Sequence, residues 1–157
     1  MEHDPIKMLK DDHKVVKKLF DEFEAADKRS MARIAREAIT ELEIHAEIEE
    51  EIFYPAVNKA VGDEMVMAEA EQEHHVVHLL IAELKQMLEG GKTGVDFQAK
   101  FTVLAENVRH HIKEEETEML PLAAKMPTAE LESVGARMAK SKSELKSQAS
   151  KIGSKRL

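Results

Sequence analysis

One short pattern occurs twice in this chain, and the repeat restricts how the chain can fold. "HAEIEEEIFYP" occupies residues 45–55 and "HIKEEETEMLP" occupies residues 111–121. Each copy starts with a histidine, has a glutamate four residues later and ends with a proline ten residues after the histidine. Residues four apart share a face of an α-helix. Both copies therefore predict a helix that presents the same two side chains on one face.

The repeat extends beyond this pattern. "DDHKVVKKLF" at residues 11–20 resembles "QEHHVVHLL" at residues 72–80, which pairs His13 with His74. The two pairs of segments are offset by 61 and 66 residues. We therefore expect two related helical hairpins that pack together.

The apolar residues recur with a period near 3.6, and the composition favours helix-forming residues. These patterns predict an all-α protein, an antiparallel up-down-up-down four-helix bundle. Pro55 and Pro121 should end the second and fourth helices, because proline disfavours helical backbone in the residue before it. Gly90 and Gly91 should end the third. The expected helices cover residues 4–26, 30–54, 63–88 and 96–120.

The last part of the chain differs in charge from the rest. Residues 133–157 contain seven Lys or Arg and one Glu, whereas the whole chain carries a net charge of −8. We expect residues 1–126 to form the bundle, and residues 127–157 to form a short helix starting at Thr128 and a loose basic tail. The tail is interpreted as a solubilising end or, alternatively, as a contact for an anionic partner or another copy of the chain.

The overall composition argues against several classes of partner. The net charge of −8 disfavours nucleic-acid binding, and no apolar run approaches the roughly 18 residues of a membrane span. The chain has no cysteine, which excludes disulfides and thiolate metal sites. The N-terminus has no apolar stretch resembling a signal peptide. We expect a cytoplasmic monomer or weak homo-oligomer.

Seven side chains that can bind a metal ion fall on the predicted core faces, whereas His75 and His110 point to the flanks. Buried imidazoles and carboxylates need partners, and a metal ion would supply them. Nitrogen and oxygen ligands without sulfur suit iron, manganese or zinc. Seven ligands are too many for one tetrahedral zinc, but two ions bridged by two carboxylates use them all. The seven are His13, His45, Glu49, His74, His78, His111 and Glu115.

These motifs resemble the hemerythrin or HHE cation-binding family, including its actinobacterial hemerythrin-like proteins, over about residues 6–122. The resemblance rests on "KDDHKVV", "HAEIEEEIFYP", "EHHVVHLL" and "HHIKEEE" followed by "LP". It implies a four-helix bundle that holds two iron ions joined by an oxo or hydroxo bridge. It further implies that His74, His78 and His111 bind one iron, that His13 and His45 bind the other, and that Glu49 and Glu115 bridge them.

Two features depart from the family pattern or add to it. In the oxygen-carrying members the bridge on the fourth helix is an aspartate five residues after its histidine. Here Glu115 follows His111 by four residues and His110 by five, so His110 is an alternative ligand. Tyr54 is the only tyrosine in the chain. It is interpreted as a packing residue at a helix end or, alternatively, as an iron ligand or a hydrogen-bond donor to bound oxygen.

Two functions are compatible with such a site. The favoured hypothesis is catalase-like disproportionation of hydrogen peroxide, which the resemblance, the glutamate bridges and Tyr54 suggest. The alternative is reversible binding of O₂ or nitric oxide for storage or sensing. Both hypotheses place small molecules, rather than macromolecules, at the site.

Overall fold

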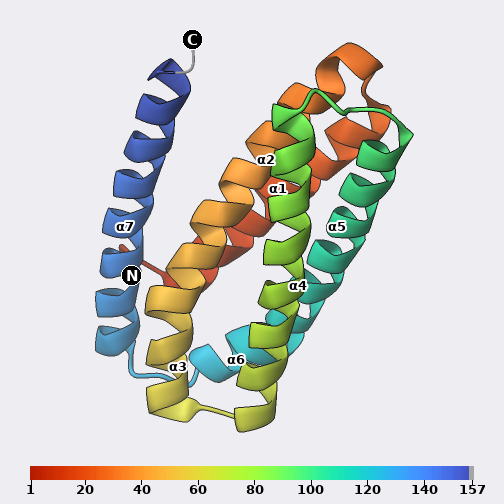
Figure 1. Ribbon diagram of the computed structural model, residues 1–157. Helices are drawn as coiled ribbons and strands as arrows, with labels where there is room; N and C mark the ends of the chain where they lie inside the picture. Colours follow the sequence, from red (N-terminus) through yellow and green to blue (C-terminus); the bar gives the residue numbers. More distant parts are fainter. Residues whose placement is uncertain (156–157) are drawn as a thin grey trace.

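The structure is a computed structural model that describes residues 1–155, with side chains described up to residue 151. Four long antiparallel helical rods form a bundle (Figure 1), as the sequence predicts. Among the described residues, no helix is both long and apolar enough to cross a bilayer. The rods are α1 (Pro5–Ala25); α2 (Lys28–Ile48) with η1 (Glu49–Phe53) and α3 (Tyr54–Val61); α4 (Glu64–Glu89); and α5 (Val95–Glu114) with η2 (Glu115–Met119) and α6 (Leu120–Ala123).

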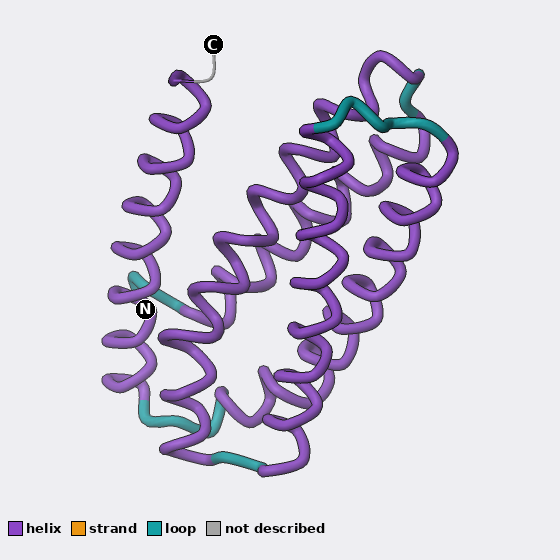
Figure 2. The backbone as a smooth tube through the Cα atoms, in the orientation of Figure 1, coloured by secondary structure: helices purple, strands orange, loops and turns teal. Residues whose placement is uncertain are grey.

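The helix starts follow from local side-chain chemistry. Asp4, Asp27 and Asp63 each accept hydrogen bonds from backbone N–H groups in the first turn of α1, α2 and α4. Pro5 follows the first of these caps, where its missing N–H costs nothing. The loop after α4 needs Gly91, whose φ of 67° suits glycine. These boundaries agree with the sequence prediction, and Figure 2 shows how short the connecting loops are.

The prediction that Pro55 and Pro121 end their helices is wrong. Each proline follows a π-helical segment, η1 or η2, and the chain continues as a helix beyond it. The π segments close with N–H groups of Tyr54 and Leu120 bonded to the carbonyls of Glu49 and Glu115, five residues back. A π turn contains one extra residue. It can therefore separate the proline ring from the carbonyl that it would strike in a regular α-helix.

The extra C-terminal helix, α7, begins at Thr128 as predicted but is not short. It runs over 28 residues to Lys155 and lies beside the first hairpin (Figure 1), so the expected loose tail is helical as far as it is described. Residues 156–157 lie outside the described part of the chain. The N-terminal segment contacts α7: a Cβ on Gly135 would lie 2.0 Å from the carbonyl oxygen of His3. The predicted boundary at residue 127 stays a prediction, since α7 shares its apolar contacts with the bundle.

Two apolar clusters fill the molecule, one at each end of the bundle. One contains Phe20, Phe97 and Phe101; the other contains Leu9, Phe53 and residues of α7 such as Met138. Each rod contributes buried polar residues close to the boundary between the two clusters. The buried polar layer consists of Asp12, His13, His45, Glu49, His74, His111 and Glu115.

Candidate metal centre

Four histidines, one from each rod, direct their rings into the polar layer. In each, Nδ1 lies against a carboxylate oxygen from another rod. Such a contact fixes the ring and, where Nδ1 carries the proton, leaves Nε2 as a free ligand atom. The pairs are His13 with Glu116 (2.7 Å), His45 with Asp12 (3.0 Å), His74 with Glu50 (2.7 Å) and His111 with Glu73 (2.9 Å).

The four Nε2 atoms converge on two buried glutamates. Glu49 has no exposed surface and Glu115 is 3% exposed. The Glu49 oxygen Oε1 lies 3.1 Å from His45 Nε2 and 3.2 Å from His74 Nε2. The Glu115 oxygens lie 3.0 Å from His13 Nε2 and 3.2 Å from His111 Nε2. Each glutamate therefore reaches one histidine of either hairpin, as a bridging ligand must.

Among the described residues, several of these buried atoms lie close to one another but form no hydrogen bond, because their contacts lack hydrogen-bond geometry. They are His13 Nε2, both oxygens of Glu49 and Oε1 of Glu115. Orphaned polar atoms in a buried layer are costly, and a cation would satisfy them. Ligands that share a cation at 2.0–2.2 Å lie roughly 3 Å apart, which matches the observed spacing. The residues therefore fit a metal.

The ligand atoms divide into two overlapping groups. His13, His45, Glu49 and Glu115 offer atoms within 4.8 Å of one another, and so do Glu49, His74 and His111. Glu49 belongs to both groups, and Glu115 contacts His111 in the second. The geometry therefore suits two neighbouring cations between shared carboxylates.

Without a cation, the histidines and glutamates of the cluster shift one another's pKa values. Burial lowers the pKa of His111, but Glu115 and Glu73 outweigh it and raise that pKa to about 10. Burial opposes ionisation of Glu115, yet its contacts with Glu49, His111 and His13 hold its pKa well below the usual range. Protons thus occupy lone pairs that a metal would need, and metal binding must release them.

Tyr54 joins the cluster, although an ideal helix would turn it away from His45. The π-helical segment η1 bonds the N–H of Tyr54 to the carbonyl of Glu49, five residues back, and brings Tyr54 to the face of Glu49. Its hydroxyl donates to Glu115 Oε2 at 2.5 Å and lies 3.1 Å from His74 Nε2 and 3.2 Å from His111 Nε2. Burial, together with the two glutamates, raises the pKa of Tyr54 well above its usual value, so the group stays a phenol.

The structure does not bring His78 or His110 into the cluster. The expectation that His78 faces the core is wrong: its side chain is 47% exposed, and its Nε2 lies 2.8 Å from Glu50. The Tyr54 hydroxyl instead lies beside His74 and His111. His110 is 66% exposed and pairs with Glu114, which leaves His111 as the inward histidine of α5.

The outer carboxylates that orient the four rings were not predicted from the sequence. The repeated pattern nevertheless places an acidic residue beside each paired position. Asp12 and Glu73 directly precede the two equivalent histidines, His13 and His74, and Glu50 and Glu116 directly follow the two bridging glutamates. The reading also missed Lys142 of α7, which donates to Asp12 Oδ1 at 2.5 Å.

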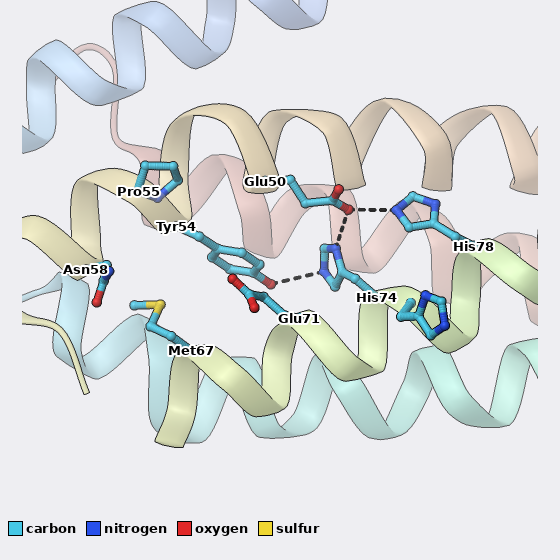
Figure 3. Close-up of a pocket in the computed structure, with 9 residues that line it drawn as sticks. Glu50, Tyr54, Pro55, Asn58, Met67, Glu71, His74 and His78 are labelled. Atoms are coloured by element: carbon cyan, nitrogen blue, oxygen red, sulfur yellow. Dashed lines mark hydrogen bonds and ion pairs between the residues drawn. The ribbon is translucent and has the colours of Figure 1, made fainter. Parts of the chain in front are cut away.

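A pocket of about 540 Å³ reaches the cluster from one side. It lies between α4 and the η1–α3 segment, and Tyr54 and His74 form its inner wall (Figure 3). Glu50 and His78 stand at its outer side, and Glu50 contacts both His78 and His74. The pocket thus extends from the surface to Tyr54 and His74, at the edge of the buried cluster.

Comparison with known proteins identifies the family. The family model of the hemerythrin HHE cation binding domain matches residues 4–123, and the chain belongs to this family. A crystal structure of a hemerythrin HHE cation binding domain-containing protein from Mycobacterium kansasii is similar, with a TM-score of 0.79 and 25% identity. The match covers 93% of this chain and 89% of that one. No curated protein matches.

Proposed function

We propose that the chain binds two iron ions between its four inward histidines and two bridging glutamates, and that the loaded centre disproportionates hydrogen peroxide. The observation that carries the proposal is the arrangement of the side chains. Two groups of potential ligands share Glu49, and several of their buried atoms form no hydrogen bond among the described residues. Histidine nitrogen with carboxylate oxygen also suits manganese and zinc. Iron is favoured because the match to the family accompanies this ligand set.

Disproportionation converts two H₂O₂ into one O₂ and two H₂O. Two electrons and two protons pass from one peroxide to the other. When bound, a pair of iron ions supplies the capacity to exchange two electrons. The protein has to admit peroxide, keep the centre free of competing reactions and move protons.

The residues of the chain suit these tasks. The pocket beside Tyr54 and His74 is wide enough for peroxide, while the apolar clusters close the two ends of the polar layer. The Tyr54 hydroxyl donates to Glu115 at 2.5 Å, so a proton lies next to the ligand atoms. A phenol and a carboxylate in contact can pass protons between the two peroxides.

The alternative function is reversible binding of O₂ or nitric oxide, and the buried histidine and glutamate ligands favour it. The position of His78 weighs against it. The resemblance to oxygen carriers implied five histidine ligands, whereas four reach the cluster, and the Tyr54 hydroxyl contacts His74 while His78 lies outside.

One experiment separates the two functions. The protein is loaded with Fe²⁺ without oxygen, its metal content is measured, and O₂ release is followed after H₂O₂ is added. Two irons per chain with repeated O₂ release would support the proposed activity, and His110→Ala, an exposed change outside the pocket lining, should behave like the wild type. Bound iron without O₂ release, together with an oxygenated form that reverts under argon, would favour the alternative. A chain that binds no iron would refute both.

The remaining expectations are part of the same proposal. We place the protein in the cytoplasm as a monomer or weak homo-oligomer that acts on small molecules, without a nucleic-acid or membrane partner. The lack of cysteine and the net charge of −8 support this. Cell fractionation and sedimentation would test it.

A further inference from the structure

The pocket carries side chains that suit a cation better than a neutral peroxide. Its lining includes two carboxylates, Glu50 and Glu71, and three histidines, and none of its lining residues is Lys or Arg. A recess lined by carboxylates attracts cations. Its volume of about 540 Å³ also exceeds what H₂O₂ needs, whereas a metal ion arrives with its shell of water.

Glu50 connects the outside of the pocket to a buried ligand. Its Oε2 atom lies 2.8 Å from Nε2 of His78 and 2.7 Å from Nδ1 of His74. The side chains of Glu50 and His78 are 41% and 47% exposed, while that of His74 is 8% exposed. A cation held by Glu50 and His78 would therefore lie one side chain away from the inner cluster.

The inner ligands themselves are closed to solvent. The side chains of Glu49 and Glu115 are at most 1% exposed, and that of His13 is 2% exposed. A cation that reaches them must lose its water stepwise, and a carboxylate and an imidazole are suitable replacements for that water.

Comparison of the two repeats argues against a purely structural role for these histidines. At the offset that pairs His13 with His74, His75 corresponds to Lys14 and His78 to Lys17. Lysine at these positions would repel a cation and cannot bind one while it is protonated. Only the repeat that borders the pocket carries histidine at both positions.

We propose that Glu50 and His78 form an outer capture site for a divalent cation, from which the cation passes through the pocket to the inner centre. The proposal rests on the proposed function to the extent that the inner centre binds metal. It assigns His78 a role in metal delivery instead of the inner-ligand role that the family resemblance implied.

The rate of metal uptake tests this proposal. Metal-free protein is mixed with Co²⁺ without oxygen, and visible absorption follows the filling of the centre. If the cation is captured before it is transferred, the loading rate of the wild type should level off at high Co²⁺ concentration, because the capture site is then always filled. His78→Ala should load about tenfold more slowly, the size of effect that an outer partner has on metal binding, yet reach the same final metal content and spectrum. His78→Lys, which copies the other repeat, should be slower still.

His110→Ala is the matched control. His110 is another exposed histidine paired with a glutamate, Glu114, and it does not line the pocket. It should load at the wild-type rate. Wild-type loading by His78→Ala would overturn the proposal. A lower final metal content in that variant would also overturn it, by making His78 a ligand of the centre. If the wild type takes up no Co²⁺ or Fe²⁺, the proposed function itself fails.

Discussion

The two hairpins build matching halves of one centre, but the surroundings of the halves differ. Each half supplies two histidines, a bridging glutamate and two outer carboxylates, in the same order along the chain. The equivalent of Tyr54 in the second hairpin is Leu120, and the equivalents of His75 and His78 in the first are Lys14 and Lys17. Within the part of the chain whose side chains are described, Asp12 is the one outer carboxylate that also pairs with a lysine, Lys142.

This difference separates two kinds of role. In the proposed centre, the matching residues are those that a pair of cations would need in duplicate. We propose that the residues that differ control access, protons and charge around it. A single duplicated scaffold would then hold two ions symmetrically, while its proposed reactive face lies on one side, next to the pocket.

The largest expected effect concerns the matched bridges. Glu49→Gln and Glu115→Gln should each leave fewer than two metal ions per chain, because an amide lacks the charge and one of the two ligand oxygens of a bridge. Metal analysis after loading with Fe²⁺ measures this. Glu47→Gln, an exposed change on the same helix as His45, is the control. Full metal content in either bridge variant would show that the halves do not share both carboxylates.

The next effect concerns the unmatched phenol. Tyr54→Phe should keep its iron but release O₂ about 100-fold more slowly, since it removes a positioned proton donor. Metal content and O₂ release, measured together, check both parts. An unchanged rate would refute the proton role. Loss of iron, or of a visible absorption band that the wild type shows, would instead identify Tyr54 as a ligand.

A smaller effect tests the matched outer carboxylates. Asp12→Asn and Glu73→Gln should each weaken metal binding by roughly 10- to 100-fold, because each carboxylate orients a histidine ligand. Competition with a chelator measures the affinity. Asp11→Asn, the exposed neighbour on α1 that pairs with Lys7, should have no effect. Unequal losses in the two variants would show how far the surroundings make the two metal positions different.

The smallest effect concerns the lysine that only one half possesses. Lys142→Met should lower the free energy of unfolding by about 1 kcal/mol, because a partly buried ion pair with Asp12 is lost. Lys140→Met, an exposed change on α7, should be neutral. Denaturant unfolding compares the two. Equal free energies of unfolding in the two variants would mean that the Lys142–Asp12 pair between α7 and α1 does not stabilise the fold.

Much of this protein follows from its sequence alone. The apolar period and the helix-forming composition predict the four rods, and the doubled pattern of histidine and glutamate predicts six of the inward-facing side chains. These predictions succeed because they depend on geometry within one helix, where a residue four positions along returns to the same face. The start of α7 at Thr128 also follows from the sequence.

Other features were decided only by the tertiary structure. Tyr54 turned inward and Pro55 was tolerated because π turns change the angle between residues, which a fixed period of 3.6 cannot express. His78 lies outside the cluster, and Tyr54, from another rod, contacts His74 within it. The pairs of Asp12 with His45 and with Lys142 join distant segments. Contacts between rods depend on how the rods pack, and no single segment of the sequence carries that information.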